Sequence, residues 1–330
     1  MSGWWIALIV LGVYLALAAL LFVFPSLVHK RRAFVVSERI LNSKRVAAFS
    51  HRGGQKEFPE NSLSAFKNSI RQGFFGLELD VHRTRCGQLV IAHDVSLQRI
   101  TGQDVLIRDV QFADIGNYLH VIHDAWSQVD DDFSQLPPEK PPLLEDLFRL
   151  VRNESVVLSI DLKSNDPDDF SRVCTMILDY GLQDRVVVGG FSSKQCKQRM
   201  RSMGISLPMF FDVRDCLVFF LATFFWVLPF TPFQNDWLMI PHAFQNFYAG
   251  HVYKNFRLAK LAGFIFWVEK WYFCLVSWHM NRRGIPVVFW VLNNRSDWQL
   301  GLGMGANGLM TDYPSRLRAF LEEKQLFGHI

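Results

Sequence analysis

The chain has little of what marks a disulfide-stabilised or a nucleic-acid-binding protein. It holds only five cysteines in 330 residues, and none belongs to a C-x-x-C pair: Cys86, Cys174, Cys196, Cys216 and Cys274. Their odd number and scatter argue against a disulfide framework or a zinc ribbon and favour buried free thiols. The formal net charge is only +4. Without a Lys/Arg-rich block or an aromatic stacking module, this charge gives no reason to expect a nucleic-acid partner.

An uncharged apolar run opens the chain. Residues 4–24 contain no charged side chain, and as a helix they would reach about 30 Å, the thickness of the bilayer hydrocarbon. A cleaved signal peptide is the alternative, but no basic residue precedes Trp4 and the run is longer than a usual signal core. Residues 1–28 are therefore predicted to be a retained transmembrane anchor.

The side of the membrane on which the rest of the chain lies stays open. A basic linker over residues 29–45 follows the anchor and favours a cytosolic location. Asn153 and Asn294 begin glycosylation tripeptides, which would matter only if this part of the chain faced a lumen.

Short β-rich runs alternate with segments of helical periodicity from residue 46 onward. Eight such runs are found, at residues 46–50, 77–81, 156–162, 186–191, 207–212, 237–240, 287–291 and 308–311. Strands alternating with helices indicate a parallel sheet, and eight units over this length predict a (β/α)8 TIM barrel. We place this α/β domain at residues 46–320, with a short tail at 321–330.

A ninth apolar run, at residues 89–92, follows the second strand too closely for a parallel crossover. It is predicted to form a β-hairpin with that strand, which would bring His93 back opposite Asp80 at the barrel mouth. Residues 94–142 then form an insertion that ends in a proline-rich stretch.

Two further segments, residues 217–233 and 261–280, are unusually apolar. The apolar part of the first is short for a spanning helix and suits an interfacial or re-entrant membrane segment. The second contains Glu269 and Lys270, which disfavours spanning. Outer barrel helices that are apolar all round are an equal alternative for both segments.

Polar residues stand where the first strands end. His51 and Arg52 follow the first strand and precede two glycines, a combination that suits acid–base chemistry beside an anion. Glu78 and Asp80 alternate along the second strand, so both project to the same face. Two such buried carboxylates need a compensating cation, and oxygen ligands favour Mg²⁺ or Ca²⁺.

The third strand repeats this alternation with Asp161 and Lys163. Asp161 is a candidate metal ligand, and Lys163 is a candidate for offsetting phosphate charge. His93 supplies a second imidazole, which would serve either as the partner of His51 in acid–base catalysis or as a metal ligand. His82 and the remaining histidines lack such neighbours and are interpreted as ordinary surface or packed residues.

Together these residues resemble the glycerophosphodiester phosphodiesterase family. The matching stretch runs from His51 through Pro59-Glu60-Asn61-Ser62, Glu78-Leu-Asp80 and His93-Asp94, and continues more weakly at Asp161-Leu-Lys163, Trp290 to Asn293 and Thr311-Asp312. Two positions depart from the family pattern, because Asp161 stands where Glu is usual and Val291 stands where Thr is usual. With the N-terminal anchor, the chain is similar to the small membrane-bound branch that has lysophospholipase D activity.

The resemblance implies roles for these residues. Glu78, Asp80, Asp161 and His93 would bind the metal, with His51 and His93 as catalytic imidazoles. Arg52 and Lys163 would contact the phosphate, and Trp290 would contact the substrate. The implied substrate is a lysophospholipid or a glycerophosphodiester, with release of the head-group alcohol at an endoplasmic reticulum or perinuclear membrane. A phospholipase C-like enzyme and a non-catalytic membrane scaffold remain the alternatives, and the oligomeric state stays undetermined.

Overall fold

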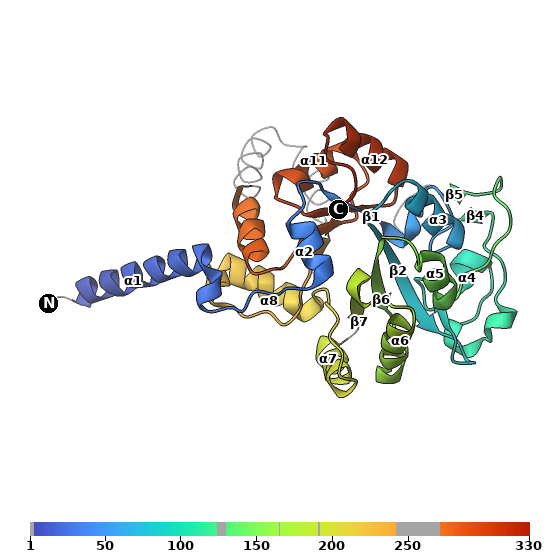
Figure 1. Ribbon diagram of the computed structural model, residues 1–330, viewed down its shortest axis with the longest axis horizontal. Helices are drawn as coiled ribbons and strands as arrows, with labels where there is room; N and C mark the ends of the chain where they lie inside the picture. The colour runs from blue at the N-terminus through green and yellow to red at the C-terminus, as the bar shows by residue number, and fades with distance from the viewer. Residues whose placement is uncertain (1–2, 124–129, 165, 191, 242–270) are drawn as a thin grey trace.

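The computed structural model describes residues 3–123, 130–164, 166–190, 192–241 and 271–330 (Figure 1). The predicted apolar segment 261–280 therefore lies partly outside the described residues. The body of the molecule is a ring of parallel strands surrounded by helices, and a single helix projects from it.

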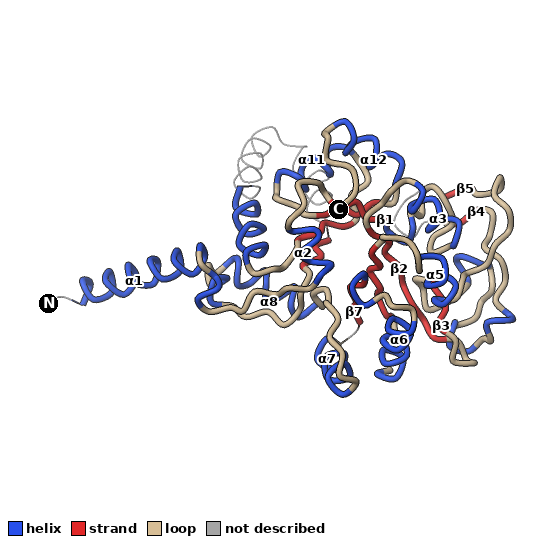
Figure 2. Tube along the Cα trace, viewed as in Figure 1, coloured by secondary structure: helices blue, strands red, loops and turns tan. Residues whose placement is uncertain are grey.

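Seven parallel strands form most of the ring, and neighbouring strands pair in the order β7-β6-β2-β1-β10-β9-β8 (Figure 2). Their bounds are β1 Ala47–Ser50, β2 Gly76–Arg83, β6 Val157–Leu162, β7 Val186–Gly190, β8 Leu238–Pro241, β9 Val287–Trp290 and β10 Gly308–Thr311. Strand β3, Leu89–Ile91, pairs antiparallel with β2, which confirms the predicted hairpin. Its register differs by one residue from the prediction, because Val81 pairs with Ile91 and Asp80 therefore lies opposite Ala92 and not His93.

The fifth predicted strand, at residues 207–212, pairs only through isolated parallel bridges. Met209 bridges to Val188 of β7, and Phe210 bridges to Trp237 just before β8. Pro208 lacks an N–H and can only accept, from the Val188 amide, which limits this segment's ladder. The two bridges nevertheless close the ring between β7 and β8, so the barrel prediction is confirmed.

Helices cover the outside of the ring. They are α3 Leu63–Arg71, α5 Leu144–Val151, α6 Pro167–Asp179, α7 Ser193–Ser202, α8 Val213–Phe224, α11 Arg295–Gly303 and α12 Pro314–Glu323, together with helical residues 271–282. Leu77, Leu79 and Val81 of β2 are fully buried in the cluster that α5 and α6 share with this strand. The alternate residues Glu78 and Asp80 are thereby left to face the pocket inside the ring.

The inserted residues after the hairpin pack around a small apolar core of their own, which includes Val90, Leu97, Ile100 and Ile107. Their elements are short: α4 Gln98–Thr101, β4 Val121–Ile122, β5 Asp131–Asp132, and the 3-10 turns η3 Ile107–Asp109 and η4 Phe112–Asp114. This part lies at the opposite end of the molecule from α1 (Figure 1).

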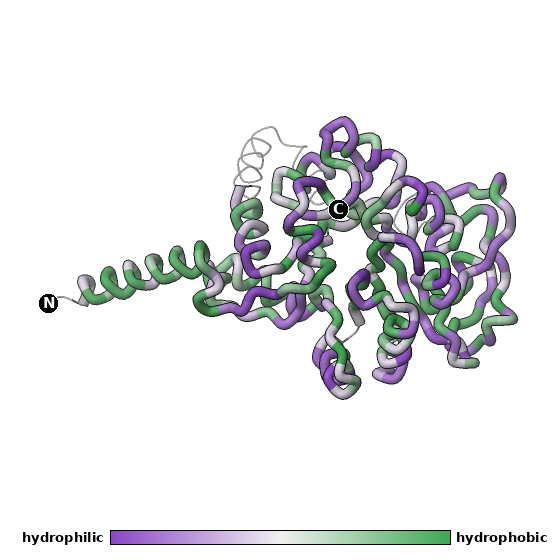
Figure 3. Tube along the Cα trace, viewed as in Figure 1, coloured by the Kyte–Doolittle hydropathy of each residue, from purple (hydrophilic) through white to green (hydrophobic). Residues whose placement is uncertain are grey.

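The projecting helix is α1, Gly3–Val23, and it is apolar along its whole length (Figure 3). Within the described ranges it is the one helix long and apolar enough to cross a membrane, with a mean hydropathy of 2.9 over Trp4–Val23. It is followed by the turn η1, Pro25–Leu27, and packs against the turn η6, Leu228–Phe230.

Within the segment predicted to be a basic linker, the structure has a helix, α2, Val35–Leu41. Its Val36 and Ile40 are buried against the residues that fill the barrel interior, among them Phe49 and Trp237. The Trp237 indole N–H donates a 2.8 Å hydrogen bond to Ser37 Oγ. Helix α2 is therefore part of the barrel's packing.

The contribution of α2 can be measured by truncating its buried face. We expect Ile40→Ala to lower the free energy of unfolding by about 2–5 kcal/mol, because a buried Ile leaves a cavity when shortened to Ala. Val35→Ala, on the exposed side of the same helix, should change it by less than about 0.5 kcal/mol. Urea unfolding of the full chain in detergent measures both values, and equal values would show that α2 does not pack on the barrel in solution.

Candidate active site

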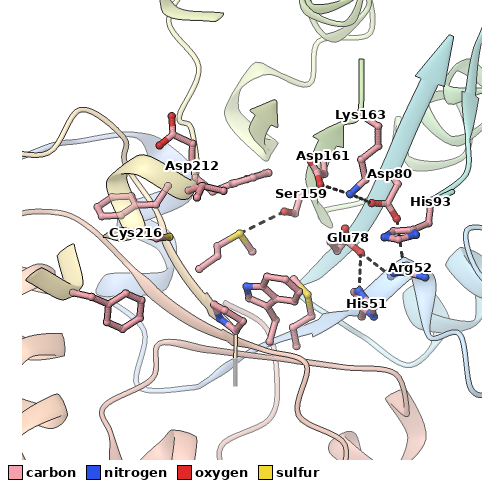
Figure 4. Close-up of a pocket in the computed structure, with 18 residues that line it drawn as sticks. His51, Arg52, Glu78, Asp80, His93, Ser159, Asp161, Lys163, Asp212 and Cys216 are labelled. Atoms are coloured by element: carbon pink, nitrogen blue, oxygen red, sulfur yellow. Dashed lines mark hydrogen bonds and ion pairs between the residues drawn. The ribbon is translucent and has the colours of Figure 1, made fainter. Parts of the chain in front are cut away.

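One pocket, with a volume of about 410 Å³, opens at the carboxyl ends of the barrel strands. Its lining includes all eight site residues predicted from the sequence: His51, Arg52, Glu78, Asp80, His93, Asp161, Lys163 and Trp290. Figure 4 shows the charged members gathered at one end of the pocket. The strand register explains this meeting, because Asp80 of β2 is the direct partner of Asp161 of β6.

The turn η2, His51–Gly53, is held in a backbone conformation that favours glycine. Arg52, Gly53 and Gly54 all have positive φ angles, of 50°, 80° and 101°. A side chain at Gly54 would lie 2.4 Å from Pro314, and one at Gly53 would lie 2.8 Å from Ala65. The Arg52 backbone is thereby turned so that its N–H donates to Glu78 Oε2 at 2.8 Å. The positive φ angles and the close contacts explain why two glycines follow His51 and Arg52 in the sequence.

His51 is oriented by a buried carboxylate that the sequence analysis assigned no role. Its Nδ1 lies 2.6 Å from Asp312 Oδ1, and Asn293 donates to the other oxygen of Asp312 at 2.6 Å. The Nε2 atom is left facing Glu78 Oε2 at 4.0 Å. Burial disfavours the charged imidazole, but Asp312 and then Glu78 raise the pKa of His51 above its usual value.

The position of Asp312 in the sequence could have marked it as a partner of His51. It follows β10, and β10 pairs with β1, the strand that ends at His51. A carboxylate at that strand end was therefore a candidate partner for His51 once the barrel order was known.

His93 has the same kind of partner. Its Nδ1 lies 2.7 Å from Asp94 Oδ1, and the other oxygen of Asp94 accepts from Arg99 Nε at 2.6 Å. His82, interpreted above as an ordinary residue, is buried, and its Nε2 lies 3.1 Å from the His93 carbonyl oxygen. An imidazole held at Nδ1 by a carboxylate can take up or give a proton at Nε2. Both imidazoles therefore have the geometry of acid–base groups.

An ion network joins the two histidine turns. Arg99 makes two hydrogen bonds to Glu60, at 2.5 and 2.8 Å, and Arg52 contacts the same carboxylate at 3.3 Å. Tyr118, from the insertion, donates to the Glu60 carbonyl at 2.8 Å. The insertion thus helps to hold Glu60 in place, and through Glu60 also Arg99 and Arg52.

The carboxylates of β2 lie in opposite electrostatic surroundings. Burial and the neighbouring charge of Asp80 raise the pKa of Glu78. Asp80 is also buried, but Lys163 at 2.8 Å and Arg52 at 3.6 Å lower its pKa. Asn61 adds a 3.1 Å hydrogen bond to Asp80 Oδ2. Asp80 is therefore the stably ionised member of the pair.

A divalent cation fits this donor set in kind. Glu78 and Asp80 offer oxygen ligands of the type that Mg²⁺ and Ca²⁺ prefer, and a cation would favour the charged form of Glu78. Asp161 is engaged by Lys163 Nζ at 2.6 Å. As the side chains stand, no three His, Cys, Asp or Glu residues in the described ranges are grouped to hold a metal ion.

The other end of the pocket is mostly apolar, with Asp212 as a charged residue in its lining (Figure 4). Residues that follow β7 and precede β9 supply this lining, namely Phe210, Phe211, Val213, Cys216, Phe220, Met239 and Pro241. The pocket therefore has a charged end and an apolar arm, which these residues line and which ends at α8.

Comparison with known proteins identifies the class of barrel. The sequence model of the glycerophosphoryl diester phosphodiesterase family matches residues 51–199. Human lysophospholipase D GDPD1 is 30% identical over 318 residues, which cover 94% of this chain and 95% of the relative. Human lysophospholipase D GDPD3 is 27% identical, covering 96% of this chain and 95% of the relative.

Solved structures agree on the fold. A putative glycerophosphoryl diester phosphodiesterase from Silicibacter pomeroyi superposes with a TM-score of 0.66 at 18% identity, over 89% of this chain and 99% of that one. A phosphodiesterase from Oleispira antarctica, solved with its product sn-glycerol-3-phosphate, gives a TM-score of 0.59 at 16% identity, over 86% and 99% of the two chains. A barrel phosphodiesterase is thus the class that fold and sequence define. The chain belongs to the glycerophosphodiester phosphodiesterase and lysophospholipase D family, and it is an enzyme.

The His51–Asp312 contact gives the first test of the site. We expect Asp312→Asn to lower kcat on a phosphodiester substrate about a thousandfold, with a smaller change in KM, because the imidazole loses the carboxylate that sets its tautomer and orientation. Asp179→Asn, on an exposed position of α6, is the matched control. Steady-state kinetics of the two variants measure the effect, and equal kcat values would remove Asp312 from the mechanism.

Proposed function

We propose that the protein hydrolyses lysophospholipids and glycerophosphodiesters in a metal-dependent reaction, releasing the head-group alcohol. With a lysophospholipid the other product is lysophosphatidic acid. The observation that carries this proposal is the single pocket in which paired imidazoles, carboxylates and cations adjoin an apolar arm. The names of the two human relatives, lysophospholipases D, support the same substrate class.

The cationic side chains of the pocket suit a phosphodiester anion. Arg52 lines the pocket, and its buried Nε makes no hydrogen bond, although Asp80 Oδ2 lies 3.6 Å from it. A phosphate oxygen within hydrogen-bond distance would satisfy this donor, which is otherwise costly to bury. Lys163 contacts the other oxygen of Asp80 and would offset the negative charge that grows on the phosphoryl oxygens in the transition state. Trp290, whose ring centre lies 6.4 Å from that of His51, would pack against the glycerol part of the substrate.

The two imidazoles would divide the proton transfers. One takes a proton from the nucleophile as its oxygen bonds to phosphorus. The other gives a proton to the head-group oxygen as that P–O bond breaks. The nucleophile is water or the substrate's own glycerol hydroxyl, which would first give a cyclic phosphate. His51 and His93 each present Nε2 for this task, because each is held at Nδ1.

Glu78 and Asp80 would hold the divalent ion, with Asp161 or His93 completing its ligands. When bound, the ion would neutralise the charge that develops on the phosphoryl oxygens. Mg²⁺ and Ca²⁺ are the candidates, since the offered donors are mainly oxygens.

We further propose that residues 1–28 anchor a catalytic domain at residues 46–320. The apolar α1, which is mostly exposed, is the support for this anchor. The resemblance to membrane-bound lysophospholipases D leads us to propose an endoplasmic reticulum or perinuclear location, which imaging of the full chain beside organelle markers would test.

The reaction is tested by release of free choline from lysophosphatidylcholine. We expect EDTA to abolish release and added Mg²⁺ or Ca²⁺ to restore it, because Glu78 and Asp80 need a cation to act together. His51→Ala should lower kcat by about 10²–10⁴-fold through loss of an acid–base group. His120→Ala, at an exposed histidine, is its control. Unchanged release in EDTA or in the His51 variant would reject the mechanism, and monoacylglycerol with phosphocholine as products would indicate a phospholipase C reaction.

The apolar arm makes a separate prediction about the acyl chain. Cys216 lines the arm, and Cys216→Trp would fill space that a chain occupies. We expect the ratio of kcat/KM for long-chain lysophosphatidylcholine to that for glycerophosphocholine to fall at least about tenfold, which corresponds to losing roughly two buried methylene groups. Cys86→Trp, at an exposed cysteine, should leave this ratio at its original value. An unchanged ratio in the Cys216 variant would place the acyl chain elsewhere.

A further inference from the structure

The end of α8 exposes a dense group of large apolar side chains. Phe224, Phe225 and Trp226 are 74%, 63% and 67% exposed. Val213, Leu217 and Leu221 continue this exposed surface along α8, at the spacing that puts residues on one face of a helix. An apolar surface of this extent marks a protein or a membrane contact.

The position of this surface relative to α1 selects the membrane. The Tyr14 ring stacks on Phe230 at 5.8 Å, and the Tyr14 hydroxyl donates to the Trp226 carbonyl at 3.0 Å. Tyr14 lies midway along the candidate span Trp4–Val23. At 1.5 Å per residue it is about 14 Å from the end of the helix. An α1 that crosses a bilayer would therefore carry residues 224–230 into the hydrocarbon beside it.

Backbone polar groups in and beside the turn have hydrogen-bond partners within the protein, as a position inside the bilayer requires. Irregular backbone at membrane depth is tolerated only where its polar groups have partners. Side chains from other parts of the chain donate to its carbonyls: Tyr14 to Trp226, His29 to Pro229 at 2.9 Å, and Arg283 to Thr231 at 2.9 Å. Tyr272 donates to the Thr223 carbonyl. The amides of Phe225 and Val227 donate to carbonyls in the last turn of α8, and the amide of Phe230 donates to the Val227 carbonyl.

The segment cannot cross the membrane. Phe210, before α8, and Trp237, after the turn, bridge each other in the same barrel. Both ends of the segment therefore lie on one side of the bilayer, so the chain must enter and return.

We propose that residues 224–230 form a re-entrant turn that dips into the bilayer beside α1, with the exposed face of α8 resting on lipid acyl chains. The inference rests on the anchoring role of α1 in the proposed function. It has a consequence for the substrate. Val213 is 87% exposed and also lines the pocket, as does Cys216 one turn further along α8. A single-chain phospholipid would pass along α8 from the bilayer into the pocket without entering water.

Lipid photocrosslinking of the full chain in phosphatidylcholine liposomes tests the turn directly. A benzophenone-bearing phenylalanine is placed at Phe225, with Leu11 of α1 and Phe112 of the insertion as positive and negative controls. We expect mass spectrometry to find phospholipid adducts at positions 225 and 11 and none at 112. An adduct at 11 without one at 225 would overturn the re-entrant turn alone. The absence of adducts at both would overturn the anchor and the turn together.

A charge placed in the turn tests whether lipid substrate reaches the pocket along α8. Phe225→Glu should lower turnover of lysophosphatidylcholine embedded in vesicles at least tenfold more than turnover of soluble glycerophosphocholine. Leu178→Glu, on the exposed surface of α6, is the matched control and should affect both substrates alike. Equal losses on the two substrates in the Phe225 variant would contradict delivery along α8. Wild-type protein that hydrolyses neither substrate would instead reject the proposed function, while the crosslinking result would still decide the turn.

Discussion

The charge on Glu78 and Asp80 is the constraint around which the site is built. Two carboxylates on the inner face of one buried strand repel each other and lose hydration, so each needs a positive or donating neighbour. The neighbours come from distant parts of the chain: Lys163 directly after β6, and Arg52 and Asn61 from the turns after β1. The pairing order β6-β2-β1 brings these segments to one rim, which is why the fold and the chemistry are specified together.

The same logic extends outward to the histidines. Each imidazole is held at Nδ1 by a carboxylate, and each carboxylate is held in turn, Asp312 by Asn293 and Asp94 by Arg99. Arg99 then pairs with Glu60, which also contacts Arg52. Displacing His93 would disturb Arg52 through this chain of ion pairs, so the imidazole and the guanidinium are fixed relative to each other.

Sequence reasoning reached the barrel from the alternation of strands and helices, and it reached seven of the eight pocket residues from their positions on or after strands; Trp290 came from the family resemblance alone. Seven predicted strands formed as expected, and the alternation of Glu78 and Asp80 placed them on the inner face. The fifth strand was reduced to single bridges, since Pro208 cannot donate to a ladder. The pairing of His51 with Asp312 was not predicted, because it depends on which strands become neighbours when the ring closes. Helix α2 was not predicted either, since its apolar face, Val36 and Ile40, is only two residues wide in a basic stretch.

The segment around α2 also sets the direction of α1 relative to the barrel, which matters for the proposed membrane arrangement. A flexible linker after α1 would let the barrel turn freely, and no fixed surface would face the lipid. Instead, Arg32 pairs with Asp236 and donates to the Phe233 carbonyl, and Ser37 accepts from Trp237. Phe22 stacks on His279 at the base of α1. With contacts on both sides of the connection, the direction of α1 is set relative to the barrel. If α1 crosses a bilayer as proposed, the apolar face of α8 would have one orientation toward it, the orientation that the proposed entry of a lipid substrate along that helix requires.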